Sequence, residues 1–196
     1  MFYEVKANLN KKQVQLLSDA GVHAIQPGIE SLNSHVLKLM RKGVTALQNV
    51  QLLKWCRQYG VNAAWNFLYG FPGEAAEDYE QMAKFIDNLC HLSPPYATGT
   101  IRLDRFSPYF NNPEDYGITG IKPFFTYGLI YPLPPEQVFN LAYFFQYEYE
   151  DGRGTQTSIE NVLEKIDNWK RNKGGELIKH YGRNPELMLL DTRPPA

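Results

Sequence analysis

The sequence has few cysteines, no long apolar run and almost no net charge. Its 20 basic and 21 acidic side chains give a formal charge of −1, which argues against a broad surface for nucleic acid or membranes. No apolar stretch approaches the roughly 20 residues that a membrane span needs, and no secretory leader is visible. We therefore expect neither a nucleic acid nor a membrane as partner.

Cysteine is represented by Cys56 and Cys90 alone. Neither has a CxxC-type partner, and both lie in expected helices, where a free cysteine is usually a small buried hydrophobe. Two such thiols fit a reducing, cytoplasmic location. The four histidines show no ligand spacing, with His35 expected on an exposed helix face and His180 on a strand surface. We therefore expect no metal site within the chain.

The first half of the chain has the pattern of repeated strand–helix units. Alternating or apolar runs predict strands at 2–8, 22–30, 61–70 and 97–106. Apolar residues at helical spacing, opened by cap residues such as Asn10 or stopped by glycines such as Gly21, predict helices at 10–21, 31–43, 45–60 and 77–92. This rhythm implies a parallel sheet with right-handed crossovers.

Polar residues on these strands help to choose between a doubly wound sheet and a (β/α) barrel. Strands buried on both faces of a parallel sheet are almost entirely apolar. Here polar side chains occur toward the carboxyl ends, namely Glu4, Lys6, Gln26, Glu30, Asn66, Arg102 and Arg105. A barrel builds its mouth from such strand ends and the loops after them. We therefore expect an α/β fold containing part of a (β/α) TIM-type barrel.

Aromatic residues, 14% of the chain, gather mostly in the second half, where prolines and glycines also break the strand–helix rhythm. There the pattern predicts loops with short strands, a helix at 135–150 and an amphipathic helix at 158–172. Two short strands are expected around a turn at 182–185. We expect a barrel portion at 1–106, an aromatic-rich extension at 107–154 and a winged-like appendage of helix and hairpin at 155–196.

The stretch WNFLYGFPGE, residues 65–74, ends a strand in two glycines, a proline and a carboxylate. Gly70 and Gly73 allow a positive φ or a close approach to a ligand. Glu74 is favoured at a helix start in any case, because of the helix dipole. A well-made strand-to-helix turn is therefore one interpretation, and a ligand-binding loop is the other.

Two other strand ends carry similar polar groups. QPGIESL (26–32) contains Glu30 and Ser31, and RLDRFSPYF (102–110) contains Arg105. Together with Asn66, these side chains would surround one cavity at the barrel mouth. That set suits a polar ligand with amine, carboxylate and hydroxyl groups.

The ordered motifs GIES, VLKLMRKG, NFLYGFPGE and RFSPYF resemble the second half of a radical S-adenosylmethionine (SAM) barrel. Over residues 2–150 the pattern resembles the cobalamin-binding branch associated with maturation of ribosomally made peptides, often called C-methyltransferases. The resemblance implies a peptide substrate and SAM bound at the strand ends. The amino acid and ribose part of SAM would lie at Glu30 and Ser31, its adenine and ribose along Asn66, Leu68 and Gly70, and its adenine beside Arg105 and Phe106. Leu68 and Phe106 suit core positions equally well.

The chain departs from that family in one respect. The family's [4Fe–4S] cluster is bound by a CxxxCxxC motif that this sequence lacks, and a cluster needs thiolate ligands. A cobalamin-binding region is absent as well. The chain therefore resembles the C-terminal portion of a larger protein, and its incomplete barrel would expose strand edges prone to self-association.

Three functions are open at this point. The chain is part of a radical SAM enzyme that methylates or otherwise modifies a peptide, with this portion alone inactive. Alternatively, it is a cluster-less half-barrel that serves as a non-catalytic binding or structural module. The third possibility is an ordinary barrel enzyme that uses Glu30 and Glu74 as an acid–base pair. The order of the motifs favours the first function, and the missing cysteines favour the second.

Overall fold

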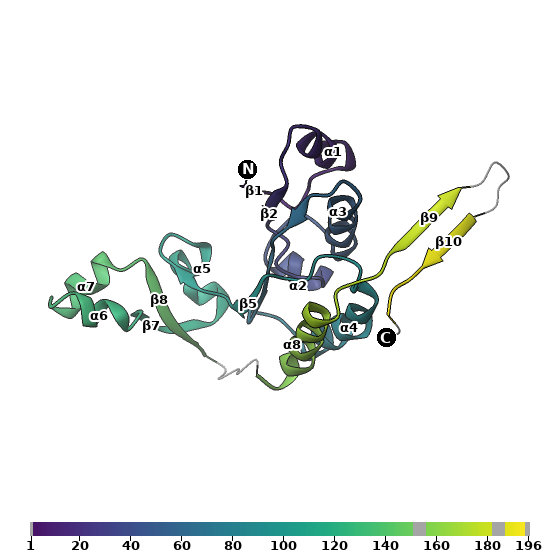
Figure 1. The fold of residues 1–196 in the computed structure, drawn as a ribbon. Coiled ribbons are helices and arrows are strands. Elements are labelled where there is room, and N and C mark those ends of the chain that lie inside the picture. The colour runs from purple at the N-terminus through teal and green to yellow at the C-terminus, as the bar shows by residue number, and fades with distance from the viewer. Residues whose placement is uncertain (1, 151–155, 182–186, 195–196) are drawn as a thin grey trace. The chain divides into compact units, whose positions relative to one another are not determined.

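The computed structural model describes residues 2–150, 156–181 and 187–194 (Figure 1). Contacts divide the chain into two compact units. Unit 1 consists of residues 1–69, 74–99 and 156–196, and unit 2 consists of residues 70–73 and 100–155. The boundaries expected from the sequence, at 106 and 154, differ from this division because the residues after 155 pack with the first half of the chain.

Unit 1 is built on parallel strands. β1 (Phe2–Val5), β2 (Ala24–Pro27) and β3 (Asn62–Ala63) form a sheet in that order, with both strand pairs parallel. β4 (Asn66–Tyr69) follows shortly after β3 in the chain. It pairs with the segment after β2 through a parallel bridge between Glu30 and Phe67. β4 also pairs with β5 (Ala97–Thr100). Strands are present in each predicted range but are shorter than expected, and the strand predicted at 61–70 is divided into β3 and β4.

Helices connect these strands, as expected for strand–helix units. They are α1 (Lys11–Asp19), α2 (Ser34–Leu39), α3 (Ala46–Gln58) and α4 (Ala76–Ile86), the last extended by the 3-10 turn η1 (Asp87–Leu89). Asn10 and Thr45 cap α1 and α3, each paired with a glutamine three residues later in a capping box. Such boxes satisfy backbone N–H groups that a helix start leaves without intrahelical partners. The predicted starts at these two residues are confirmed.

The two faces of the sheet have different environments. Ile25, Ala63, Trp65 and Phe67 are buried in one continuous core with residues of the helices. Alternate residues on β2 and β4, such as Gln26 and Asn66, are only partly buried. A sheet with helices on one face and polar residues on the other is the arrangement of a barrel wall.

The C-terminal helix belongs to the core of unit 1. α8 (Gln156–Arg171) packs along α4, and its buried stripe is the one predicted from the sequence, namely Ile159, Val162, Ile166 and Trp169. The Trp169 ring lies 6.2 Å from that of Trp65, and its indole N–H donates to the carbonyl of Leu92 at 3.2 Å. This helix therefore closes the core beside α4.

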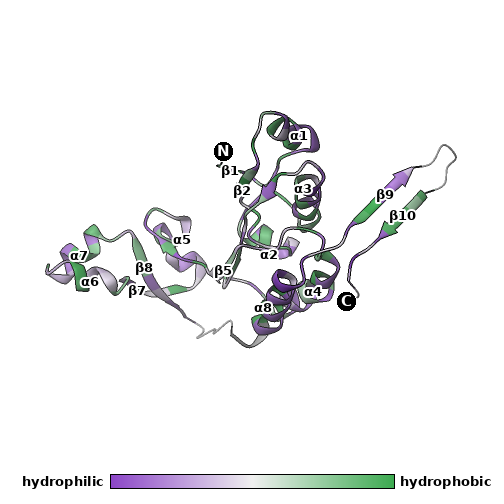
Figure 2. Ribbon diagram, viewed as in Figure 1, coloured by the Kyte–Doolittle hydropathy of each residue, from purple (hydrophilic) through white to green (hydrophobic). Residues whose placement is uncertain are grey.

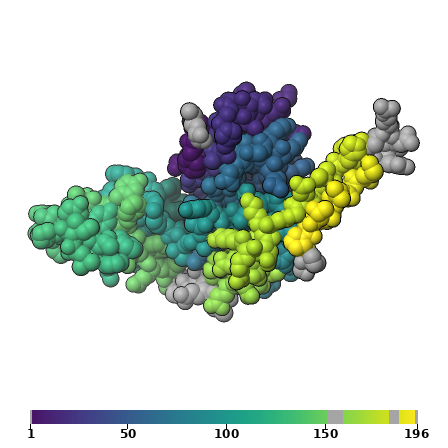
Figure 3. Space-filling model, in the orientation of Figure 1, coloured from purple at the N-terminus to yellow at the C-terminus, as the bar shows by residue number. Residues whose placement is uncertain are grey.

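An antiparallel hairpin of β9 (Leu177–Tyr181) and β10 (Leu187–Asp191) follows α8. Both strands are predicted from the sequence, and the turn expected at 182–185 lies outside the described residues. Every residue of both strands is exposed, and Figure 3 shows the strands uncovered on the visible face. They are exposed even though Figure 2 colours much of β10 as hydrophobic. Arg193 holds the base of the hairpin by donating to the carbonyl of Asn88 at 2.8 Å.

Unit 2 is a small antiparallel sheet with short helices. β6 (Leu103–Asp104), β8 (Phe144–Tyr149) and β7 (Ile118–Pro123) lie in the order β6-β8-β7. The intervening segments form α5 (Pro108–Asn111), η2 (Pro113–Tyr116), α6 (Thr126–Ile130) and α7 (Pro135–Leu141). A second, aromatic core around Leu103, Ile118 and Phe145 holds the unit together.

The predicted helix at 135–150 is wrong in its second half. α7 ends at Leu141, and residues 144–149 form β8 instead. Burial along β8 alternates, with Phe145, Tyr147 and Tyr149 less exposed than Gln146 and Glu148. Aromatic residues suit strands. The two-residue period outweighs the pattern that suggested one long helix, namely apolar Val138, Leu141, Phe144 and Phe145.

Among the residues that the structure describes, no helix combines the length and the hydropathy that crossing a membrane requires.

Removing the Trp169 side chain is expected to destabilise unit 1 by about 3–5 kcal/mol, because Trp169→Ala leaves a large cavity and an unpaired carbonyl in the core. Urea unfolding followed by far-UV circular dichroism measures the change. Tyr181→Ala, which removes an aromatic ring that is 71% exposed on the hairpin, is the matched control and should shift stability by less than about 0.5 kcal/mol. Equal effects of the two variants would contradict the packing of α8 in the core.

Candidate functional site

The chain turns sharply after β2, at the GIES motif. The N–H of Ser31 donates to the carbonyl of Ile29 at 2.7 Å, which closes a three-residue turn with Glu30 at its centre. Glu30 has φ = +56°, a value that side chains with a Cβ rarely adopt. A conformation of this kind costs about 1–3 kcal/mol and persists only where neighbouring groups hold it, which is common at functional sites.

Neighbouring elements hold all three carbonyls of this turn. The carbonyl of Glu30 accepts from the N–H of Leu68 on β4 at 2.9 Å. The side-chain amide of Asn49, on α3, donates to the carbonyls of Ile29 at 3.1 Å and Ser31 at 2.9 Å. Asn49 is completely buried. The turn is therefore fixed from both sides by β4 and α3.

The Glu30 carboxylate forms an ion pair with Lys42, at 2.6 Å, in the segment after α2. Their side chains are 25% and 28% exposed respectively, so the pair is open to solvent on one side. Gly28 lies against both groups, since a Cβ built on it would be 3.4 Å from Lys42 Nζ and 3.6 Å from Glu30 Oε1. A Cβ at position 28 would therefore make ordinary van der Waals contact with both charged groups.

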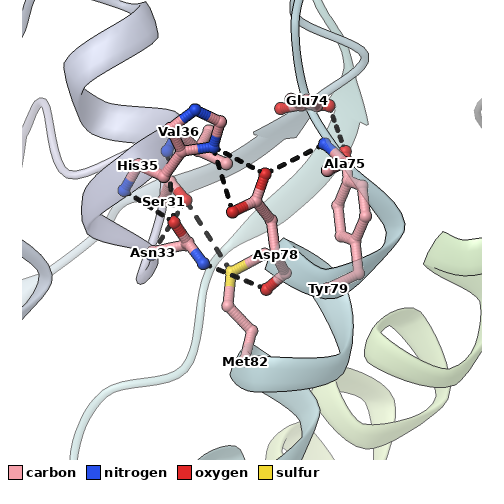
Figure 4. A network of polar contacts seen from close by, with 9 residues as sticks. All are labelled: Ser31, Asn33, His35, Val36, Glu74, Ala75, Asp78, Tyr79 and Met82. Carbon is pink, nitrogen blue, oxygen red and sulfur yellow. Dashed lines mark hydrogen bonds and ion pairs between the residues drawn. The ribbon is translucent and has the colours of Figure 1, made fainter.

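Ser31 does not point toward the open strand end. It is completely buried, and its hydroxyl accepts from the N–H of Asn33 at 3.1 Å and lies 3.7 Å from the sulfur of Met82 (Figure 4). The hydroxyl expected at the barrel mouth is thus used inside unit 1. The expectation that it reaches the mouth is wrong, because the turn at Glu30 rotates the next side chain inward.

Asn33 and Asp78 join the starts of α2 and α4 (Figure 4). The Asn33 side-chain oxygen accepts from the N–H groups of His35 and Val36 at 2.7 and 3.2 Å, and its amide donates to the carbonyl of Asp78 at 3.2 Å. The buried Asp78 carboxylate accepts from the N–H of Ala75 at 2.9 Å and pairs with His35 Nδ1 at 2.9 Å. The GIES segment and the helix after GFPGE are thereby tied together.

The segment expected to lie along the adenine and ribose is divided between the two units. Asn66 and Leu68 are half-buried on one face of β4 in unit 1. Gly70 belongs to unit 2, where φ is +84°, and Gly73 has φ = +87°. Of the two explanations that the sequence offered for these glycines, a positive φ or a close approach to a ligand, both glycines show the first. Their roles in binding remain predictions.

Arg105 and Phe106 lie in unit 2. The Arg105 guanidinium donates to the carbonyls of Ala142 and Phe139 and lies 5.0 Å from the centre of the Phe145 ring. It therefore holds α7 and β8 together within the unit. Phe106 has φ = +70° and is 73% exposed. A bulky residue held in this conformation at the surface is an outlier of the kind found at functional sites.

Sequence reasoning missed Lys42, Asn49, Asn33 and Asp78. Asn49 offers one weak signal, because asparagine is unfavourable inside a helix unless its side chain has a partner. His35 is expected on an exposed helix face, and it is exposed, but its contact with Asp78 spans 43 residues. Contacts over such separations leave no pattern in a single sequence.

The two cysteines do not provide a cluster site. Cys56 and Cys90 are buried, and burial raises the pKa of the Cys56 thiol to about 12, so that Cys56 is protonated at neutral pH. The described residues contain no group of three or more His, Cys, Asp or Glu that could hold a metal ion. A [4Fe–4S] cluster is bound by several thiolates, so the residues of this chain do not fit it.

Residues 2–86 match the sequence profile of the Radical SAM superfamily. They belong to this superfamily. An uncharacterized methyltransferase of Pyrococcus horikoshii is 32% identical over 80 residues, which make up 41% of this chain and 17% of that protein. A ribosomal protein uS12 methylthiotransferase of Elusimicrobium minutum is 38% identical over 60 residues, 30% of this chain and 14% of that protein.

Likeness in fold to a solved structure extends beyond the matched segment. The radical SAM methyltransferase TsrM of Kitasatospora setae, solved with cobalamin and a [4Fe–4S] cluster bound, superposes with a TM-score of 0.56 at 16% identity. The superposition covers 88% of this chain and 37% of that chain. This likeness establishes a partial TIM-type barrel fold. The radical SAM segment described here spans less than half the length of each of these proteins.

Asp78→Ala is expected to destabilise the protein by about 2 kcal/mol, because it removes the acceptor for the Ala75 N–H and the partner of His35. Urea unfolding measures the effect, and a double-mutant cycle with His35→Ala isolates the coupling between the two side chains. Glu80→Ala, an exposed acid on the same helix, is the control. An Asp78→Ala midpoint equal to that of Glu80→Ala would contradict the structural role of this network.

Anaerobic incubation with iron and sulfide is expected to give this chain no stable, stoichiometric cluster, because it lacks the thiolate set. Visible absorbance and iron content after gel filtration measure incorporation. The Cys56→Ser/Cys90→Ser double variant gives the background level. One cluster per chain that disappears in the double variant would show that the buried thiols can become ligands.

Proposed function

We propose that this chain provides the SAM-binding strand ends of a larger radical SAM methyltransferase. The observation that carries the proposal is the strained turn at Glu30, which holds a partly exposed carboxylate at the end of a parallel strand in a radical SAM segment. Ligands of parallel α/β sheets bind at the carboxyl ends of the strands. A turn that costs free energy and is held by three neighbouring contacts supports a role in binding.

The charges at this strand end suit the amino acid part of SAM. SAM carries an ammonium, a carboxylate and a sulfonium. Glu30 offers a carboxylate to the ammonium, and Lys42, 2.6 Å away, offers an ammonium to the ligand's carboxylate. On β4, Asn66 offers amide hydrogen bonds and Leu68 offers an apolar contact, both half-exposed. In this proposal these residues bind and orient SAM, and the chemistry that follows depends on cofactors bound elsewhere.

Methyl transfer is proposed as the reaction of the whole protein because the relatives named above include a methyltransferase and a methylthiotransferase, and TsrM is a methyltransferase solved with cobalamin. A [4Fe–4S] cluster and cobalamin, a ribosomally made peptide as substrate, and a cytoplasmic location are further parts of this proposal. Since this chain lacks the thiolates for a cluster, we expect it to be inactive alone.

Isothermal titration of SAM into this chain tests the proposal. We expect weak binding that Glu30→Ala and Asn66→Ala abolish, because each removes one of the polar groups at the strand end. Glu160→Ala removes an exposed carboxylate on α8 and should bind SAM like the unchanged chain. Binding that survives in all three variants would place the ligand elsewhere and defeat the assignment.

A non-catalytic binding or structural module is the second candidate, favoured by the two buried cysteines. A folded chain that shows no SAM binding in the same titration would support this candidate over the first. An acid–base pair of Glu30 and Glu74 has less support, since Glu30 pairs with Lys42 and Glu74 accepts from the Tyr79 hydroxyl.

Self-association through a strand edge is also proposed. β1 is the outer strand of its sheet, and Phe2 and Tyr3 on it are 54% and 45% exposed. Unprotected edges of this kind pair with other chains. Sedimentation velocity should show a concentration-dependent dimer that Tyr3→Lys weakens, and a monomer at all concentrations would contradict it.

A further inference from the structure

We propose that Asn49 is the positioning residue of this site: its buried amide holds the turn at Glu30 and so orients the Glu30 carboxylate. This inference rests on the proposed function, because it takes Glu30 to bind the ligand. Asn49 itself lies on α3 and has no contact with solvent. It therefore acts through the turn and not on the ligand.

The geometry assigns this role to one side-chain nitrogen. Asn49 Nδ2 donates to the carbonyls of Ile29 at 3.1 Å and Ser31 at 2.9 Å, the residues on either side of Glu30. An amide group has two N–H donors at a fixed angle, and here both are directed at the same turn. The two bonds fix the peptide group that precedes the strained residue and the peptide group that follows Ser31.

The other end of the same side chain supports this interpretation. Asn49 Oδ1 is buried and has no hydrogen-bond partner among the described residues. An unsatisfied buried acceptor destabilises a protein, and an apolar residue of the same shape would avoid it. A polar residue that serves only packing has no reason to occupy this position. The two donated bonds to the turn supply that reason.

The arrangement also explains how the strain at Glu30 persists. The turn is held by Asn49 on one side and by the Leu68 N–H, which donates to the Glu30 carbonyl, on the other. Without Asn49, the carbonyls of Ile29 and Ser31 each lose the bond from its amide, and Glu30 is free to relax to a negative φ. That relaxation would move the carboxylate away from Lys42, and misplaced binding groups lose affinity.

Amide hydrogen exchange, followed by NMR on the 196-residue chain with its backbone resonances assigned, tests the positioning without any ligand. In Asn49→Leu, the amides of Ser31 and Leu68 should exchange at least tenfold faster relative to Ala64. The N–H of Ala64 donates to the carbonyl of Ile25 at 2.9 Å on the same strand pair, before the turn, and reports general loosening. Asn49→Ser keeps one short donor and should give an intermediate ratio, which covers the case in which Asn49→Leu does not fold.

Leu53→Ala is the matched control. Leu53 is buried in the same helix, one turn from Asn49, and its truncation should accelerate exchange at all three amides equally. Unchanged exchange ratios in both Asn49 variants would overturn the proposal. Ratios that change equally in Leu53→Ala would overturn it too, because they would reflect packing alone.

Titration of SAM separates this inference from the proposed function. If the unchanged chain binds SAM, Asn49→Leu should raise its Kd about tenfold, the change expected from losing one charged hydrogen bond, while Leu53→Ala leaves it within about twofold. Equal affinity in Asn49→Leu would overturn the positioning role. If the unchanged chain binds no SAM, the proposed function fails for this chain, and the exchange ratios alone decide whether Asn49 holds the turn.

Discussion

The end of β2 must hold a non-glycine residue at positive φ, and much of the candidate site depends on that constraint. Glu30 at φ = +56° needs continuous restraint. The restraint comes from α3 through Asn49 and from β4 through Leu68. Both elements follow Glu30 in the sequence: α3 is part of the connection between β2 and β3, and β4 comes after β3. This connection and the next strand must therefore be folded before the carboxylate has a defined position.

The same units also fix the helix that follows β4. Asn33 caps α2 and donates to the carbonyl of Asp78, whose carboxylate accepts from the Ala75 N–H at the start of α4. Each helix start leaves N–H groups without intrahelical partners, and here the partners are shared between two helices. A substitution at one helix start therefore also disturbs the hydrogen bonds at the other. This sharing links the two motifs, GIES and GFPGE, that flank the strand ends.

Local signals in the sequence were sufficient for most of unit 1. Cap residues such as Asn10 and the alternation of apolar residues predicted the helices and the positions of the strands, because both depend on neighbours within about four residues. The prediction of a helix at 135–150 was wrong in its second half, because the aromatic residues there fit both the helical period and the two-residue period of a strand. Pairing with β6 and β7 makes this segment a strand. Asn49 was missed because its partners Ile29 and Ser31 are 20 and 18 residues away. Asp78 was missed because Asn33 and His35 are 45 and 43 residues away.

The groups that shape the strand end at Glu30 all come from unit 1 itself. Asn49, Leu68 and Lys42 hold the turn and its carboxylate, and none of them would be a ligand of an iron–sulfur cluster, which takes thiolates. The geometry that we propose orients the amino acid group of SAM is thus a property of the folded strand–helix units. A cluster bound by other residues would supply electrons to SAM without setting the shape of this turn. Binding and reaction can therefore be measured separately, the first on this chain and the second only with the thiolate ligands present.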